Sequence, residues 1–294
     1  MTDYPTDAAA SCLLDDYTTL RFRGPDAGKF LQGQLSNDLD RLQPAAIMRA
    51  GLHNPQGRTL ALLWLAKSSE GDILALLPQE LAGAVTTQLR RYLLRARLTI
   101  TDESAQHQVC GHWQPGLVEL PTGWWRLDAA RAITLRSPAT TAAPSRAMTR
   151  AQWRALDIAA GAPQVYSATA GQFVAQMLNL DCIDAVSFTK GCYTGQEVIA
   201  RAHYRGRVKR RMQRFETLLP APLAAGDAGQ LEDGRGFRVV ESLLRADGRS
   251  EFLAVAPLAA THGARSDAEP GAAPTTGVAF TRARVLPLPY PLPE

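Results

Sequence analysis

One cysteine stands among residues that could make its thiol reactive. Cys192 lies in the segment KGCYTGQEVIAR, residues 190–201, two positions after Lys190 and close to two glycines. Thr194 and Glu197 have the spacing of a capping box, which predicts that a helix begins just after the thiol. The helix N-terminus and the lysine would both stabilise a thiolate and lower the pKa of Cys192 below the usual ~8.5. The segment therefore predicts a reactive thiol or an anion-binding loop, with a small buried cysteine in a strand-to-helix turn as the alternative.

The elements around this segment must position it. Residues 185–188, AVSF, form a short apolar run that we expect to be a strand leading into the loop. Earlier, strand patterns at 51–66 and 71–78 are followed by a helical pattern that begins at Pro78. This mixture predicts a compact α+β unit over residues 47–135.

A second helical pattern follows a stretch rich in proline, serine, threonine and alanine. Residues 136–149, RSPATTAAPSRAMT, are typical of a linker. Thr149 and Gln152 form another capping box, and Trp153 lies on the apolar face of the helix that they start. After residue 205, short strand patterns separated by glycine-rich turns predict a small all-β domain or barrel.

The composition limits the classes of protein that remain. The chain has 294 residues, a net charge of +4 and four cysteines that form no CxxC pair. Such cysteines do not make a disulfide framework, so a reduced, cytoplasmic protein is expected. The first residues lack the pattern of a signal peptide, and no window approaches the ~18 consecutive apolar residues of a membrane span.

The motifs as a set resemble one family. KGCYTGQEVIAR is followed by YRG and KRR, and it is preceded, in order, by LLDDYTTLRFRGPDAGKFLQGQLSND, NPQGR, LRRYLLRARLTITD, WRALDIAAGAP and GQFVAQMLNLD. Over about residues 10–215 the chain resembles the YgfZ family of folate-binding proteins, which are relatives of the aminomethyltransferase of the glycine cleavage system. The remaining residues are similar only in being rich in strand patterns.

This resemblance implies an α+β, aminomethyltransferase-like folate-binding fold, with three domains around a central hole and a C-terminal β-barrel. Residues 1–46 together with 143–204 are expected to form the folate-binding domain that contains the thiol. Residues 47–142 form the second domain, and residues 205–294 form the barrel and an extended tail. The implied ligand is tetrahydrofolate or a derivative.

The resemblance also assigns roles to residues. Cys192 is the functional thiol, and Tyr17 and Trp153 supply aromatic rings that suit a flat pterin. Asn54 and Arg58 flank a turn that is expected to face the hole. The residues expected to bind folate are Tyr17, Trp153, Asn54, Arg58, Gln176, Lys190, Gly191, Tyr193, Gly195, Gln196, Glu197, Arg201 and Arg205.

Two other groups of side chains have both a functional and a structural explanation. His107, Cys110 and His112 are metal-ligand types, but strand alternation puts only Cys110 and His112 on one face, so no metal is expected. The basic residues between Arg205 and Arg214 could bind nucleic acid or the anionic tail of a folate. A solvated strand face is the preferred explanation for most of them, with Arg205 as the expected exception.

The resemblance further implies a function in maintaining iron–sulfur enzymes, among them those that thiolate tRNA. Two alternatives remain, namely a folate-dependent aminomethyl or other one-carbon transferase and a direct tRNA-binding module. In the related transferase, carboxylates occupy positions that align with Ala61 or Leu62 and with Ala159. Methyl and isobutyl groups cannot accept a proton, so we expect folate binding without the chemistry of a classical enzyme.

Overall fold

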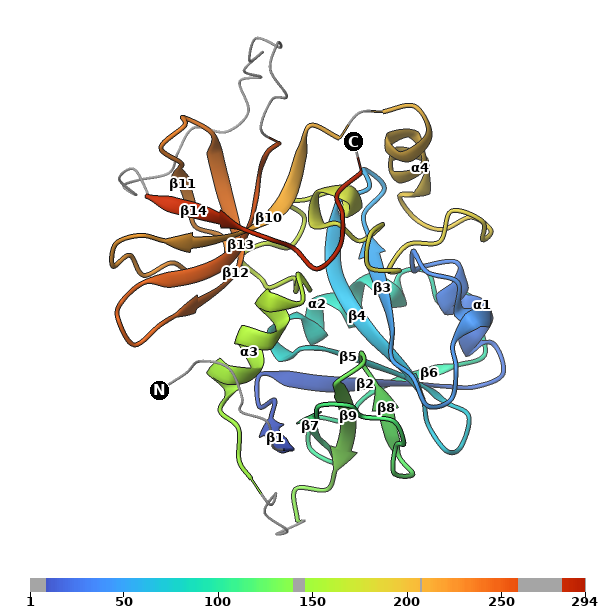
Figure 1. Ribbon diagram of the computed structural model, residues 1–294. Coiled ribbons are helices and arrows are strands. Elements are labelled where there is room, and N and C mark those ends of the chain that lie inside the picture. The colour runs from blue at the N-terminus through green and yellow to red at the C-terminus, as the bar shows by residue number, and fades with distance from the viewer. Residues whose placement is uncertain (1–8, 140–145, 207, 259–281, 294) are drawn as a thin grey trace.

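Three antiparallel sheets form the framework of the protein. The computed structural model describes residues 9–139, 146–206, 208–258 and 282–293. Figure 1 shows the last of the three sheets on one side of the molecule and the other two on the opposite side, with helix α3 (Arg150–Ala159) between them. The fold is therefore of the α+β class.

The first sheet has the strand order β3-β4-β5-β2-β6. Its strands are β2 (Tyr17–Arg23), β3 (Met48–His53), β4 (Thr59–Lys67), β5 (Ile73–Pro78) and β6 (Thr99–Asp102). Along β5, Ile73, Ala75 and Leu77 join one hydrophobic core, whereas Leu74 and Leu76 join another. Since successive side chains of a strand point to opposite faces, this sheet is covered on both sides.

Helices cover one face of the first sheet. These are α1 (Ala27–Gln32) and α2 (Ala82–Arg90), with the short 3₁₀ turns η1 (Leu39–Arg41) and η2 (Gln79–Leu81). Val85 and Leu89 of α2 pack into the same core as Phe22 of β2. The helix predicted from Pro78 onward is thus present, but it begins as a 3₁₀ turn.

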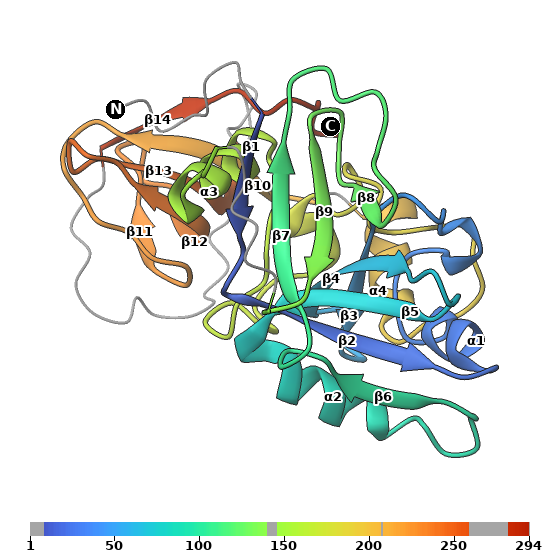
Figure 2. The ribbon, with the colours of Figure 1, turned by 90° about the horizontal axis from the view of Figure 1, so that it is seen from below.

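The second sheet covers the other face, with the order β1-β7-β9-β8. Its strands are β1 (Ala10–Leu13), β7 (Gln108–Trp113), β8 (Trp124–Arg126) and β9 (Arg131–Arg136). Figure 2 shows β7 and β9 beside the first sheet, with β1 next to α3. Helix α3 begins with the predicted capping box, in which Thr149 and Gln152 each bind the other's backbone N–H, so that prediction is confirmed.

The third sheet is open rather than closed in the part of the chain that the structure describes. Its strands are β10 (Arg210–Thr217), β11 (Ala228–Gln230), β12 (Gly236–Leu244), β13 (Ser250–Pro257) and β14 (Ala283–Leu286), in the order β11-β12-β13-β10-β14. The two edge strands β11 and β14 are not paired with each other in the described residues. The expected C-terminal β-barrel is therefore corrected to a five-stranded open sheet. Phe215, Phe237 and Phe252 pack together on one face of it.

Strand pairing crosses the boundary expected at residue 46. β2 pairs with β5 and β6, and β1 pairs with β7, so the N-terminal segment is hydrogen-bonded into sheets made mostly by residues 47–142. The largest core also joins Leu20 of β2 to Val255 of β13. Residues 140–145 of the expected linker lie outside the described part of the chain.

The C-terminal tail returns to the middle of the molecule. The hydroxyl of Tyr290 donates a hydrogen bond of 2.7 Å to the carbonyl of Gly161, which follows α3. It also accepts a hydrogen bond of 3.3 Å from the side-chain amide of Asn179. The extended tail thus connects the third sheet to α3 and to the loop that leads toward Cys192. Within the described residues, every helix is too short or too polar to cross a membrane.

Candidate functional site

The thiol lies at the tip of an irregular loop. Residues 185–188 form no strand, contrary to the expectation, and helix α4 (Gln196–Tyr204) begins four positions after Cys192. Gly195, at φ +83°, is the residue before the helix, and no side chain caps it, so the capping box expected at Thr194 is wrong. Cys192 is exposed, and a Cβ placed on Gly191 would meet no atom within 4 Å. The alternative of a buried filler cysteine is thereby excluded.

Lys190 holds the base of this loop. Its Nζ donates hydrogen bonds of 2.7 Å to the carbonyls of Gln32, Leu35 and Asn37, at and just after the end of α1. An ammonium group has three N–H bonds, so none is left for the thiol or for a folate. Burial lowers the pKa of Lys190 to about 8, opposed by the carboxylates of Asp38 and Asp40.

The loop packs directly on the turn that joins β3 to β4. A Cβ on Gly195 would lie 2.5 Å from the carbonyl oxygen of Asn54, and one on Gly57 would lie 2.9 Å from Cβ of Val198. Both glycines also have positive φ, so no other residue fits either position without strain. The NPQGR and KGCYTGQE motifs, far apart in the sequence, therefore form a single structural unit.

Three expected folate-binding residues in and around this unit make contacts with the backbone. Arg58 donates from Nη1 to the carbonyl of Gln172 at 2.6 Å, and its backbone N–H binds the side chain of Asn54 at 2.9 Å. Gln176 is buried and donates to the carbonyl of Ile199 in α4 at 2.7 Å. Asn54, Arg58 and Gln176 thus stabilise the loop and its helix.

Behind the loop lies a histidine that the sequence analysis did not identify. His53 is fully buried 6.4 Å from the ring of Tyr193, and neither of its ring nitrogens has a hydrogen-bond partner. Burial lowers the pKa of His53 to about 3, so the ring is neutral at physiological pH. The available signal was a polar residue directly after the apolar residues Ala50, Gly51 and Leu52 of a strand.

Tyr17 lies in a different place, between the first and second sheets. Its ring is 6% exposed and packs on Trp64 with the centroids 4.9 Å apart. Its hydroxyl accepts a hydrogen bond of 2.8 Å from Gln164, and burial raises the pKa of Tyr17. Arg49 is directly opposite Trp64 in the register of β3 and β4, so it shares this face of the sheet.

Trp153 is buried nearby, inside the second core. It has no exposed surface, and a Cβ on Gly111 of β7 would lie 2.4 Å from its ring. The guanidinium of Arg131 lies 5.3 Å from the ring centroid. Neither face of the indole is open to a pterin in this structure, so stacking on Trp153 stays a prediction that would need the ring to be uncovered.

A network of buried and half-buried charges joins the three sheets around Tyr17. Arg150 of α3 binds Asp16 through two hydrogen bonds of 2.8 and 2.9 Å. The other ion pairs are Arg131–Asp157 at 2.6 Å, Arg131–Asp128 at 2.7 Å and Arg154–Glu241 at 3.2 Å, and Tyr166 also binds Glu241. Sequence reasoning missed this network because its members come from distant segments.

Arg49 is the member of this region without an acidic partner. In the described part of the chain its guanidinium makes no hydrogen bond or ion pair, although the residue is half-buried. Burial, and then the positive charge of Arg131, lowers the pKa of Arg49. A charged residue in the apolar strand 48–53 was the signal that could have identified it. This guanidinium is suited to bind an anionic group, to which its N–H groups would donate.

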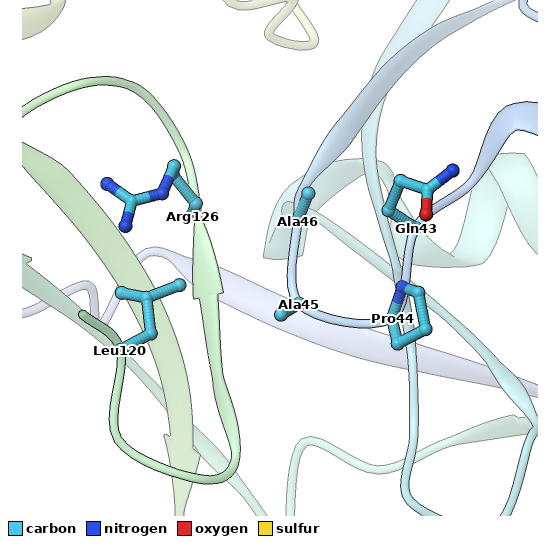
Figure 3. A pocket seen from close by; sticks show the side chains of 6 residues that line it. All are labelled: Gln43, Pro44, Ala45, Ala46, Leu120 and Arg126. Atoms are coloured by element: carbon cyan, nitrogen blue, oxygen red, sulfur yellow. The ribbon is translucent and has the colours of Figure 1, made fainter. Parts of the chain in front are cut away.

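Among the described residues, the surface includes two hollows that are not lined by any expected site residue. One of about 490 Å³ is lined by Asp16, Pro78, Gln79, Glu80 and Tyr166, next to the buried charges. The other, of about 600 Å³, lies between residues 43–46 and the segment containing Leu120 and Arg126 (Figure 3). The guanidinium of Arg126 already donates to the carbonyls of Leu117 and Val118, so the larger hollow offers no free charge.

The remaining expected residues lie on helix α4. Arg201 pairs with Glu197 at 2.8 Å, and both side chains are more than two-thirds exposed, at 71% and 84%. Arg205 follows the helix and is also exposed, whereas Gln196 is half-buried. The expected folate-binding residues therefore lie in three places. These are the loop unit, the outer surface of α4, and the region around Tyr17 and Trp153 where the three sheets meet, which we call the junction.

The basic run and the possible metal ligands have mostly structural environments. Arg211 is buried and binds Asp181 through two hydrogen bonds of 2.9 Å, whereas Lys209 and Arg210 are exposed. Arg207 lies outside the described residues. His112 stacks on Trp124 with centroids 3.6 Å apart, and no group of three or more metal-binding side chains occurs in the described segments.

We predict that Cys192 reacts with iodoacetamide at least about 10-fold faster than the other three thiols at pH 7.5. Burial raises the pKa of Cys12 and Cys182 to about 11 and raises that of Cys110, so these three have few thiolates, whereas Cys192 is exposed. Mass-spectrometric mapping after limited labelling measures the rates. Faster labelling of any other cysteine in folded protein would contradict the prediction, and Cys192→Ser supplies the control.

Comparisons with known proteins agree on a single relationship. No family model matches the chain. It is 28% identical over 260 residues to the tRNA-modifying protein YgfZ of Serratia proteamaculans, which covers 79% of this chain and 78% of that protein. It is 31% identical over 244 residues to an uncharacterised protein of Haemophilus influenzae, with 80% and 84% covered.

A solved structure has the same fold. The glycine cleavage system aminomethyltransferase T from Bartonella henselae superposes with a TM-score of 0.65, covering 85% of this chain and 78% of that one. The sequence identity is 14%, so this likeness concerns the fold alone. The aminomethyltransferase-like architecture expected from the motifs is confirmed.

Proposed function

The chain belongs to the YgfZ family, and we therefore propose that it is a cytoplasmic folate-binding accessory protein that helps to maintain iron–sulfur enzymes. Its ligand is tetrahydrofolate or a derivative, and its clients are enzymes that thiolate tRNA. Cys192 is the functional thiol of this activity. The relatives named as tRNA-modifying proteins support the link to tRNA.

The observation that most supports this proposal is the contact between the NPQGR turn and the KGCYTGQE loop. Gly57 and Gly195 leave room for each backbone to approach the other, and a side chain on either one would collide with the opposite motif. Lys190 then fixes the loop to the end of α1. The NPQGR turn and the end of α1 thus both fix the KGCYTGQE loop, which holds Cys192 at the surface. Such support is expected for a thiol that functions there.

The charge pattern of the junction supports an anionic ligand such as a folate, which carries glutamate carboxylates. Arg49 has no acidic partner among the described residues, whereas Arg131, Arg150 and Arg154 each pair with a carboxylate. A ligand carboxylate beside Arg49 would form a charge-assisted hydrogen bond in a place partly shielded from water. The ring of Tyr17, with Trp64 behind it, lies on the same side of the sheet.

The transferase alternative has less support from the chain. Ala61 and Leu62 are fully buried in β4, and Ala159 ends α3, so none of the aligned positions offers a carboxylate. Asp157, the nearest acid in α3, binds Arg131 at 2.6 Å. An acid held in an ion pair of that kind is a poor general base.

We predict that the protein binds tetrahydrofolate and that Arg49→Met weakens binding about 10-fold or more. Losing a hydrogen bond between a charged pair typically costs ~1.5–3 kcal/mol, which corresponds to a change of this size. Calorimetric titration under argon measures the affinity. Methionine keeps an unbranched apolar stem and removes the guanidinium with its charge and its donors.

The matched control is Arg90→Met, which removes an exposed arginine at the end of α2. It should leave the affinity unchanged. Absence of heat with wild-type protein at millimolar tetrahydrofolate would refute the proposed ligand. Equal affinities of the two variants would remove Arg49 from the site.

A further inference from the structure

Helix α4 presents a face that no other part of the described chain covers. Ile199 is fully buried and anchors the helix. With 3.6 residues per turn, Glu197, Arg201 and Tyr204 lie on the side opposite to Ile199. Tyr204 is 65% exposed, so most of its ring is accessible to a ligand.

Three aromatic rings meet at the end of this helix. Phe188, from the loop before Cys192, stacks on His203 with centroids 3.7 Å apart and the planes 12° from parallel. The edge of Tyr204 approaches both rings, at 4.7 Å from His203 and 6.2 Å from Phe188. His203 and Tyr204 are exposed and Phe188 is half-buried, so the three rings form an aromatic cluster that solvent can reach.

Three exposed basic residues follow this aromatic cluster in the sequence. Arg205, Lys209 and Arg210 are exposed, and in the residues that the structure describes none of them forms an ion pair. The single acid on this face, Glu197, is paired with Arg201. We call Phe188, His203, Tyr204, Arg205, Lys209 and Arg210 the α4 surface.

We propose that the α4 surface binds single-stranded RNA, with bases stacked on Tyr204 and His203 and phosphates bound by Arg205, Lys209 and Arg210. Aromatic rings beside unpaired cations are the combination that binds unpaired nucleotides, because every base has a flat face and every linkage has a charge. An acidic protein segment would bind the cations but leave the rings uncovered. The inference does not depend on folate binding, which we place at Arg49.

The test measures binding of the full-length protein to a fluorescein-labelled 12-nucleotide RNA by anisotropy at 50 and 200 mM KCl. With about three phosphate contacts, log K should fall with log salt at a slope of roughly −2. Tyr204→Ala should weaken binding about 10-fold without changing the slope, because stacking is not ionic. The double variant Lys209→Ala/Arg210→Ala should weaken binding and bring the slope to roughly −0.7.

Matched controls come from another part of the surface. Tyr92→Ala removes an exposed tyrosine just after α2, and Arg90→Ala/Arg91→Ala removes two neighbouring exposed arginines. Neither should change RNA affinity by more than about twofold. The midpoint of urea denaturation, measured on Tyr204→Ala, should equal that of the wild type and shows that this variant is folded.

Several outcomes would overturn the proposal. These are no RNA binding at 50 mM KCl, equal loss in Tyr204→Ala and Tyr92→Ala, or competition by polyglutamate as effective as by unlabelled RNA. Equal affinity for duplex RNA would indicate a general polyanion surface instead. A single-stranded DNA of the same sequence shows whether the 2′-hydroxyl matters. Failure of folate binding alone would refute the function proposed above and leave the α4 surface intact.

Discussion

Replacing Lys190 with methionine should lower the free energy of unfolding by about 3–5 kcal/mol. The ammonium group donates to three carbonyls at 2.7 Å, and the residue is 9% exposed. Methionine has a similar length but no N–H, so the carbonyls of Gln32, Leu35 and Asn37 would lose their donor where water has little access. Each buried carbonyl without a partner costs roughly 1–3 kcal/mol.

Urea denaturation at pH 7 measures this change. Lys29→Met is the matched control, because Lys29 is exposed on α1 close to the same carbonyls. It should change stability by less than about 0.5 kcal/mol. If Lys190→Met were as stable as the control, Lys190 would not be the anchor of the loop. The rate of Cys192 alkylation should also change in Lys190→Met, since the loop loses its attachment.

Replacing Trp153 with alanine should lower the free energy of unfolding by about 3–5 kcal/mol, whether or not a ligand is present. The ring is fully buried and fills the space above Gly111. Loss of folate affinity in this variant would therefore reflect a damaged core as well as any lost contact. A gentler pair of substitutions separates the two effects.

Gly111→Ala and Trp153→Phe form that pair. The Cβ added at Gly111 would lie 2.4–2.7 Å from Cζ3, Cη2 and Cε3 of the indole, so Gly111→Ala alone should be strongly destabilising. Phenylalanine lacks the fused second ring, so in the Trp153→Phe background the same alanine should cost much less. A coupling energy of about 1–3 kcal/mol in the double-mutant cycle is expected. Additive effects would contradict the packing described here.

The family, the α3 helix and the motifs that meet at the loop could be predicted from the sequence. The capping box at Thr149 could be predicted because its donors and acceptors lie within four residues of each other. The same pattern at Thr194 failed because Gly195, in a left-handed conformation, occupies the position directly before the helix. The spacing of threonine and glutamate in the sequence is compatible with a side-chain cap at Thr194 and with a left-handed glycine before the helix. The packing around the helix start decides between them.

The errors about individual site residues have a common physical cause. Lys190 is two positions from Cys192 in sequence, but its hydrogen bonds go to carbonyls more than 150 positions away. Trp153 lies on the predicted apolar face, but only the second sheet determines that both sides of its ring are covered. The barrel was inferred from strand patterns, which do not reveal whether the two edge strands meet.

The hydrogen bonds between Lys190 and carbonyls near the N-terminus also determine the order in which parts of this protein can fold during synthesis. Every strand of the first sheet has been synthesised by residue 102, whereas Lys190 emerges 88 residues later. At a translation rate of ~5–20 residues per second, that interval is roughly 4–18 s, longer than small domains typically need to fold. The loop is therefore assembled on a sheet that has had time to form. If the N-terminal half of a chain has misfolded, the carbonyls that bind Lys190 are not in place. The loop that exposes Cys192 can therefore take its position only on a correctly folded first sheet.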